Sequence, residues 1–219
     1  MVSCVHFSPD GTRLVTASWH KTVKIWDPST GACLSISQEQ PNRHKDDVRS
    51  VHFSPCGEKI ASGGGHQFTN RDYAIRIWDG TTGEQIGSPL SGHRSAVTSV
   101  SWSHDGTRLA SGSWDKTVRI WNPSTGEELC QLTDHCDWVN SVAWAPDGRR
   151  LASGSNDKTV KIWDPNTGEC LRTLMGHMHF VKSVCFSPCG GHVVSGGGDR
   201  NGSKEGSIRI WDVTTGEEV

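Results

Sequence analysis

The sequence predicts an all-β protein built from five copies of one four-stranded unit, and two observations support this prediction. The first is a repeat, because Ile-Trp followed by Asp or Asn places tryptophan at positions 26, 78, 121, 163 and 211. The second is the shortness of the connections, since three to six residues cannot hold the crossover helix that parallel strands need. Repeats of about 40–45 residues with four short antiparallel strands are typical of β-propeller blades.

The third copy shows the four expected strands, which we call a to d. Residues 97–102 alternate between apolar and polar side chains, and shorter apolar segments follow at 109–112, 118–121 and 128–132. In Ser8-Pro9-Asp10-Gly11, proline stands second and glycine fourth, which suits a type I turn between strands a and b. The turn glycine recurs at Gly57, Gly106, Gly148 and Gly190, so the same hairpin is expected in every copy.

We interpret residues 1–219 as one domain, with blades at 1–36, 45–90, 94–132, 136–174 and 178–219. The last blade is expected to be incomplete, because the sequence continues only three residues into its strand d. A strained ring of five blades, an open arc and a part of a larger propeller all remain compatible with the sequence. An open arc would expose strand edges and favour self-association.

Composition excludes several other classes of protein. Of the 219 residues, 33% are hydrophobic, and the longest apolar run has four residues, too short for a membrane helix. The first residues do not show the pattern of a secretory signal, so we expect a cytoplasmic protein, with the nucleus as the alternative. A net charge of −2 makes nucleic-acid binding unlikely.

The motifs Gly92-His93, Ser111-Gly112-Ser113, Asp115-Lys116-Thr117 and Ile120-Trp121 occur together at a defined spacing. With them the chain resembles the WD-repeat β-propeller family over essentially its whole length. The resemblance implies a buried, hydrogen-bonded tetrad of His, Ser, Asp and Trp in each blade. The implied members are His44, Ser62, Asp72 and Trp78 in blade 2, His93, Ser111, Asp115 and Trp121 in blade 3, His135, Ser153, Asp157 and Trp163 in blade 4, and His177, Ser195 and Trp211 in blade 5.

Two blades depart from this pattern. In blade 5 the aspartate position corresponds to Glu205, or to Asp199 before an insertion, and in blade 1 His20 stands where aspartate is expected. The residue types also make chemical sense, because an indole N–H only donates and needs an acceptor, which a serine hydroxyl supplies while donating onward. Blade 1, with Thr16 and Trp26 alone, should therefore be the loosest.

Enzyme, metal and cofactor sites are not expected. His93, Ser111 and Asp115 resemble a hydrolase triad, but they recur in several copies, whereas a catalytic site is needed once. The usual nucleophile-elbow, phosphate-loop and zinc-protease motifs are absent from the sequence. One basic position recurs in strand c, and we expect its aliphatic stems to pack between blades with their charges in water, at Lys24, Arg76, Arg119, Lys161 and Arg209.

The connections separate the two faces of the propeller. From the turn glycine to the Ser or Thr of strand b the distance is five residues in every copy. From that Ser or Thr to the strand-c tryptophan it is 10 residues in blades 1, 3 and 4 but 16 in blades 2 and 5. The face that carries the b–c and d–a connections, here the top face, is therefore the variable one, and variable loops on a rigid scaffold usually hold binding residues.

Trp19, Trp114 and Trp138 fall in top-face connections, and tryptophan is enriched in the energetic centres of protein interfaces. We therefore expect a non-catalytic scaffold that binds proteins or peptides there; the alternative that each indole lies flat on a neighbouring loop stays open. The expected binding residues are Trp19, Trp114, Trp138, Phe180, Arg71, Asp47, Asp137 and Asn156. A second hypothesis is a segment of a larger multidomain WD-repeat protein whose activity lies outside this chain. A third is nucleic-acid or small-ligand binding in the central channel.

Overall fold

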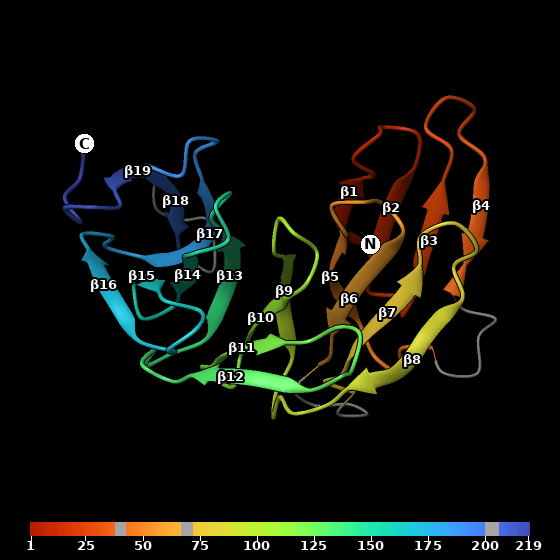
Figure 1. Ribbon diagram of the computed structural model, residues 1–219, viewed down its shortest axis with the longest axis horizontal. Coiled ribbons are helices and arrows are strands. Elements are labelled where there is room, and N and C mark those ends of the chain that lie inside the picture. Colours follow the sequence, from red (N-terminus) through yellow and green to blue (C-terminus); the bar gives the residue numbers. More distant parts are fainter. Residues whose placement is uncertain (38–42, 67–71, 200–205) are drawn as a thin grey trace.

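The computed structural model describes residues 1–37, 43–66, 72–199 and 206–219. Over this part of the chain the strands form five antiparallel sheets that stand side by side in an open arc (Figure 1). The prediction of an all-β protein with five antiparallel blades is confirmed. Two residues of the sequence interpretation, Arg71 and Glu205, lie outside the described residues.

The first four sheets have four strands each and run in the order a to d. Blade 1 contains β1 (Val2–Phe7), β2 (Leu14–Ser18), β3 (Val23–Trp26) and β4 (Cys33–Ile36), and blade 2 contains β5 (Val48–Phe53), β6 (Lys59–Gly64), β7 (Ile75–Asp79) and β8 (Gln85–Leu90). Blade 3 contains β9 (Val97–Trp102), β10 (Leu109–Ser113), β11 (Val118–Trp121) and β12 (Glu128–Leu132), and blade 4 contains β13 (Val139–Trp144), β14 (Leu151–Ser155), β15 (Thr159–Trp163) and β16 (Cys170–Met175).

Blade 5 has a sheet of three strands, β17 (Phe180–Phe186), β18 (His192–Gly198) and β19 (Ser207–Asp212). Beyond β19 a single bridge joins Trp211 to Glu218 in place of a full strand d. In every blade strand a lies on the inner side of the arc, and β8, β12 and β16 lie at its outer rim (Figure 1). The inner strands therefore decide what lines the central channel.

Neighbouring blades are joined by hydrophobic clusters of one repeated composition. Between blades 3 and 4, residues of β10, β11 and β12 such as Ile120 pack against Val139 and Val142 of β13. Close approach requires glycine in strand b, since a Cβ on Gly112 would come within 2.8 Å of Val139. Four such clusters join the five blades over the described residues.

Backbone and hydroxyl groups add a repeated polar link at the same junctions. The hydroxyl oxygen of Ser50 in strand a accepts a hydrogen bond from the backbone N–H of Val100 in the next blade, at 3.0 Å. Ser99 and Ser141 accept in the same way from the following blades, each at 3.1 Å. From blade 2 onward, each inner strand is therefore held in register with the next one by an apolar contact and a hydrogen bond to a serine. In blade 1, Cys4 stands at the serine position and donates to the carbonyl of Val51 at 3.5 Å.

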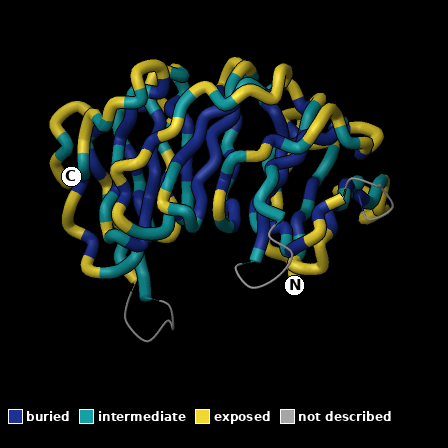
Figure 2. Tube along the Cα trace, turned by 90° about the horizontal axis from the view of Figure 1, so that it is seen from below, coloured by how far each residue is buried: buried dark blue, intermediate teal, exposed yellow. Residues whose placement is uncertain are grey.

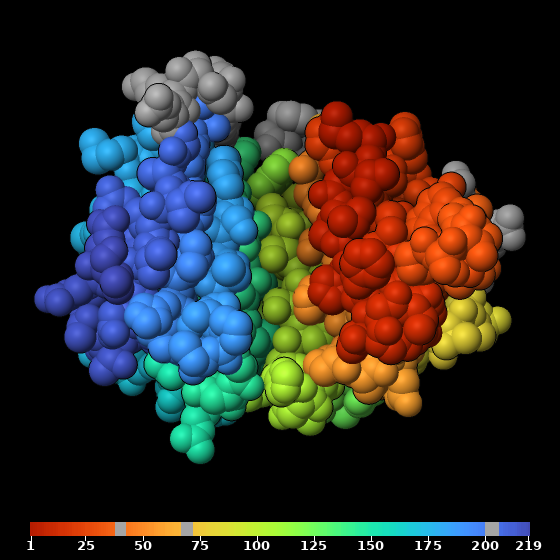
Figure 3. Space-filling view, turned by 90° about the horizontal axis from the view of Figure 1, so that it is seen from above, coloured from red at the N-terminus to blue at the C-terminus, as the bar shows by residue number. Residues whose placement is uncertain are grey.

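The two ends of the arc expose the two halves of this junction. On blade 1, Val5 is 57% exposed, whereas its counterpart Val51 on blade 2 is 1% exposed. On blade 5, Ile208 is 78% exposed, and a Cβ on Gly196 would meet nothing within 4 Å. Figure 3 looks into the open side of the arc, where blade 1 (red) and blade 5 (blue) flank a recess with blade 3 (green) between them.

Hydrogen bonds between turns assign the two faces. On the bottom face, Arg13 after the a–b turn of blade 1 donates to the carbonyl of Gly80 in the c–d connection of blade 2, at 2.7 Å. On the top face, the N–H of Trp114 in a b–c turn donates to the carbonyl of Ala96 in a d–a connection, at 3.0 Å. The exposed turns lie at the two edges of the molecule, with buried strands between them (Figure 2).

No helix among the described residues is long and apolar enough to cross a lipid bilayer.

The contribution of the blade junction to stability can be tested by comparing two isoleucines at the same repeat position. Ile75 and Ile208 are equivalent in strand c, yet Ile75 is fully buried and Ile208 is 78% exposed. We expect Ile75→Ala to lower the free energy of unfolding by about 2–5 kcal/mol, and Ile208→Ala to change it by about 0.5 kcal/mol or less. Urea unfolding curves of the two variants measure this, and equal losses would contradict the assignment of the junction.

Candidate functional site

The top-face loops are anchored by the tetrads beneath them. In blade 3 the Trp121 indole N–H donates to the Ser111 hydroxyl at 2.9 Å, and that hydroxyl lies 2.7 Å from His93 Nε2. His93 Nδ1 lies 2.8 Å from the Asp115 carboxylate, so the ring accepts from serine and donates to aspartate. Blade 4 repeats this chain through Trp163, Ser153, His135 and Asp157 at 2.8, 2.7 and 2.6 Å.

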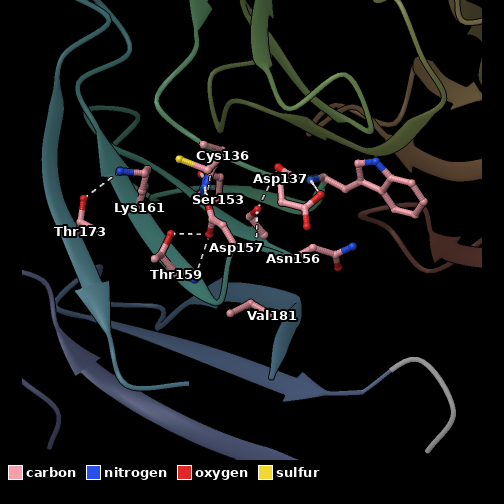
Figure 4. A network of polar contacts seen from close by, with 12 residues as sticks. Cys136, Asp137, Ser153, Asn156, Asp157, Thr159, Lys161, Thr173 and Val181 are labelled. Atoms are coloured by element: carbon pink, nitrogen blue, oxygen red, sulfur yellow. Dashed lines mark hydrogen bonds and ion pairs between the residues drawn. The ribbon is translucent and has the colours of Figure 1, made fainter. Parts of the chain in front are cut away.

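The carboxylate at the end of the chain ties two loops together. Asp115 accepts from the backbone N–H of Arg94 in the d–a connection, at 2.9 Å, and from the N–H of Thr117 in the b–c turn, at 3.0 Å. Burial by itself raises the pKa of Asp115, but hydrogen bonds from His93 and Thr117 outweigh it and hold the pKa well below its ordinary value. The equivalent contacts of Asp157 with Thr159 and Cys136 can be followed in Figure 4.

Blade 2 uses the same residues with the opposite polarity. Arg76 donates to His44 Nδ1 and to the Asp72 carboxylate, both at 3.0 Å, so the His44 proton lies on Nε2 and is donated to Ser62 at 2.7 Å. Burial, followed by the charge of Arg76, lowers the pKa of His44 to about 3. The expectation that this basic position keeps its charge in water is wrong here, because Arg76 is 4% exposed and its guanidinium is paired.

The same expectation is wrong in blade 3, where Arg119 is buried and forms an ion pair with Glu128. A strand-c guanidinium can leave water because strand d, or in blade 2 the tetrad, supplies a carboxylate beside it. Packing of the stems between blades therefore carries the charged ends into the protein as well.

In blades 5 and 1 the described residues form part of the tetrad. His177 Nε2 lies 2.7 Å from Ser195, and Trp211 donates to Ser195 at 2.8 Å. His177 Nδ1 lies 3.0 Å from the Ser207 hydroxyl. Of the two expected aspartate equivalents, Glu205 and Asp199, Glu205 lies outside the described residues, so the fourth tetrad member of blade 5 stays a prediction. In blade 1, Trp26 donates to Thr16 at 2.9 Å.

An aromatic cluster lies on the top face beside the channel, and we define it as Trp19, Arg49, Trp114 and Trp138. Trp114 and Trp138 stack with ring centroids 4.6 Å apart and an interplanar angle of 24°. The guanidinium of Arg49 lies 4.3 Å from the centroid of the Trp114 ring. Trp19 is 45% exposed and lines, together with Arg49 and Trp114, a hollow of about 370 Å³.

Arg49 is the member that sequence reasoning missed. It is the second position of strand a, counted from the first valine of that strand. This position points into the upper channel and is filled differently in each blade, by Ser3, Arg49, Thr98, Asn140 and Lys182. Arg49 Nε donates to the carbonyl of Gly65 at 2.8 Å, and burial lowers the pKa of the guanidinium against the opposing effect of Asp47. The sequence does contain a signal for a functional residue here. The residue at this position changes from blade to blade, whereas the valine before it and the serine or cysteine after it recur in every blade.

The other expected binding residues have different surroundings. Asp47 and Asp137 are half-buried beside the cluster, with Asp47 4.0 Å from Arg49 and Asp137 accepting from the Trp138 N–H at 2.8 Å. Phe180 is half-buried with the Lys182 ammonium 4.9 Å from its ring centroid.

Asn156 is a correction to the expected binding set. It is 3% exposed, and its side-chain oxygen accepts from Asn140 at 2.8 Å, so it holds the loop from inside (Figure 4). Its backbone N–H also donates to the carbonyl of Trp138. The sequence could not show this, because the b–c turn points the side chain inward.

Metal binding has no support in the described part of the chain, where no group of three or more His, Cys, Asp or Glu side chains is placed to hold an ion.

Comparison with known proteins gives one family and several relatives. The sequence profile described as "WD domain, G-beta repeat" matches residues 1–27, 36–79, 83–122, 126–164 and 168–212. Similar curated proteins are guanine nucleotide-binding protein subunits beta from Oryza sativa subsp. indica, 31% identical over 126 residues, from Zea mays, 32% over 126, and from Arabidopsis thaliana, 32% over 123. Each match covers 55% of this chain and 31–32% of the relative, so the chain spans about a third of their length.

The charge of a tetrad can be tested with Asp115→Asn. We expect the free energy of unfolding at pH 7 to fall by about 1.5–3 kcal/mol, because one amide oxygen replaces a carboxylate that accepts from several donors. The folded pKa is depressed, so this contribution is present above the unfolded value of about 3.9 and is lost as pH falls towards the folded pKa. Urea unfolding at pH 7 and pH 2.5 should show a difference from the parent that shrinks in acid.

Blade 5 offers the matched control. Ser207 contacts the tetrad histidine His177 with a neutral hydroxyl, so Ser207→Ala removes a hydrogen bond without removing a carboxylate. A loss in Asp115→Asn that is equal at both pH values would contradict the assigned charge.

Proposed function

Because the chain belongs to the WD-repeat family of β-propellers, we propose that it is a non-catalytic scaffold that binds a protein or peptide partner on its top face. The observation that carries the proposal is the aromatic cluster, in which a stacked pair of indoles and a guanidinium stand beside the exposed ring of Trp19. Tryptophan and arginine are the residue types most enriched in binding hot spots.

The cluster is ordered before any partner arrives, and this favours binding. Trp114 is fixed by its backbone bond to Ala96, and the neighbouring Asp115 is fixed by the tetrad. A partner that inserts an apolar group beside Trp19 would therefore immobilise few side chains of this protein. Pre-organisation of this kind improves affinity because less conformational entropy is lost on association.

The surroundings of the tetrad serine support the absence of catalysis. Ser111 has no exposed surface, and its hydroxyl is engaged with Trp121 and His93. A catalytic serine must reach a substrate carbonyl, and this one cannot without unpacking the blade. The same burial holds for Ser62, Ser153 and Ser195, so the repeated groups are better explained as blade-packing devices.

The relatives support protein partners in general terms. Their names describe one subunit of a guanine nucleotide-binding protein, that is, a component of an assembly. Because the matches cover about a third of those proteins, a role as one segment of a larger WD-repeat protein remains the second candidate function. We place the protein in the cytoplasm, with the nucleus as the alternative, as part of the same proposal.

The proposal predicts that Trp19→Ala separates binding from stability. A partner obtained by affinity capture with the intact chain should bind this variant about 30-fold more weakly, corresponding to about 2 kcal/mol. The free energy of unfolding should change by about 0.5 kcal/mol. Leu129→Ala is the matched control, because Leu129 is 47% exposed, close to the 45% of Trp19, but lies in β12 at the outer rim. Unchanged binding by Trp19→Ala would refute the top-face site.

The ends of the arc support a second interaction, head-to-tail self-association of this 219-residue chain. Blade 1 exposes Val5 and blade 5 exposes Ile208, the two sides of the contact buried at every internal junction. Val5→Asp alone and Ile208→Asp alone should each sediment as monomers. An equimolar mixture should form 1:1 dimers, because each variant retains the face that the other has lost. Dimers of either variant alone, or no dimers in the mixture, would contradict this pairing.

A further inference from the structure

A second cavity lies at the bottom mouth of the channel, on the opposite face from the aromatic cluster. Its volume is about 570 Å³, within the range of small-molecule sites, and all five blades contribute to its lining. We call it the lower cavity. The top-face proposal makes no use of it.

The lower cavity is built from three repeat positions. Counted from the first valine of strand a (Val2, Val48, Val97, Val139 and Val181), the fifth position supplies His6, His52, Ser101, Ala143 and Cys185. The sixth position supplies the aromatic rings of Phe53, Trp102, Trp144 and Phe186, and the second residue of the a–b turn supplies Pro9, Pro55, His104, Pro146 and Pro188. The cavity wall therefore has three layers in order towards the mouth. The first contains varied side chains, the second contains aromatic rings, and the third contains prolines with His104.

The walls are apolar and carry no permanent charge, since the lining contains no Asp, Glu, Lys or Arg. The indole N–H groups are already used, with Trp102 donating to the carbonyl of His52 at 3.2 Å and Trp144 to that of Ser101 at 3.1 Å. These rings therefore offer carbon surface alone. The lining itself gives an ionised ligand no ion pair in return for its lost hydration. The nearby cations are already placed against the aromatic rings, Arg108 at 4.6 Å from the Trp144 centroid and Arg13 at 5.6 Å from the Phe53 centroid.

The principal polar feature is an imidazole pair on adjacent blades. The rings of His6 and His52 lie with centroids 3.8 Å apart. The backbone N–H of Phe53 donates to His6 Nδ1 at 3.3 Å, so this nitrogen accepts and the proton lies on Nε2. His52 Nδ1 is buried without a hydrogen-bond partner, and we assign the proton of this ring to Nε2, which is not among the buried atoms that lack a partner.

Both imidazoles are uncharged at neutral pH. Burial lowers the pKa of His6. Burial, with a further contribution from His6, lowers the pKa of His52 to about 3. Two neutral rings with their N–H groups on Nε2 can donate to a ligand atom that accepts, and the fixed Nδ1 atoms cannot take a ligand proton.

We propose that the lower cavity binds a small uncharged aromatic compound that carries a carbonyl group, with its ring against the aromatic and proline layers and its oxygen accepting from Nε2–H of His52 or His6. The aromatic walls select the flat apolar body. The imidazole pair selects an acceptor over a donor, and the absence of lining charges disfavours an acid.

Three probes of one shape test this selection by NMR. Acetophenone has the ring and the acceptor, α-methylstyrene has the same outline without the oxygen, and benzoate adds a negative charge. Acetophenone should shift the imidazole nitrogen signals of His6 and His52 and bind about 3–10-fold more tightly than α-methylstyrene, the fold-change for one hydrogen bond. It should also bind more tightly than benzoate, because the carboxylate must lose its hydration. Long-range proton–nitrogen spectra of the free protein should show the Nε2–H tautomer for both rings.

Two variants test whether the preference for acetophenone depends on the His52 imidazole. His52→Phe keeps a ring against His6 but removes its donor, so the preference for acetophenone over α-methylstyrene should fall. His20→Phe is the control, because it makes the same exchange at an exposed histidine in the b–c turn of blade 1, outside the lining of the lower cavity, and should leave the preference unchanged. If His52→Phe does not fold, the relative affinities of the three probes for the parent protein still test the proposal. Equal affinity for all three, or no imidazole shift at saturating probe, would overturn the proposal.

Discussion

The contact between neighbouring blades is the constraint on which the rest of this structure depends. Strand a of one blade packs its valines into strands b, c and d of the blade before it, and glycine in strand b lets the backbones approach. Because each inner strand from blade 2 onward also accepts a backbone hydrogen bond from the next, the strands cannot slide relative to one another. A one-residue slip would turn every buried valine outward.

Fixed register explains why both channel mouths are built from repeat positions. The second position of strand a, counted from its first valine, points into the upper channel and the fifth into the lower one, while the residues between them pack or link blades. The packing positions must be alike in every blade, whereas the channel positions are free to differ. Arg49 in the upper channel and the pair of His6 and His52 in the lower one use that freedom.

The sequence predicted what each blade must repeat. The spacing of the tryptophans and turn glycines is set by hairpin geometry inside one blade, so the strands and the blade count followed from local pattern. The placement of Trp19, Trp114 and Trp138 on one face followed from the alternation of connections.

What depended on contacts between residues far apart in the sequence was not predictable. The ring contact of Arg49 with Trp114 joins residues of blades 2 and 3, and the burial of Asn156 follows from its bond to Asn140. The reversed polarity of the blade 2 tetrad depends on Arg76 leaving water, which the repeated basic position concealed because other blades pair it with strand d. Such contacts become visible once the chain has been folded in three dimensions.

Amide hydrogen exchange measured strand by strand tests most directly the claim that junctions hold the protein together. Strand β10 lies between two junctions and is buried throughout, whereas its equivalent β18 has a neighbouring blade on one side. If junctions dominate stability, amides of β10 should exchange only through global unfolding, and those of β18 should exchange faster through local opening. Equal protection in the two strands, or greater protection in β18, would contradict the account.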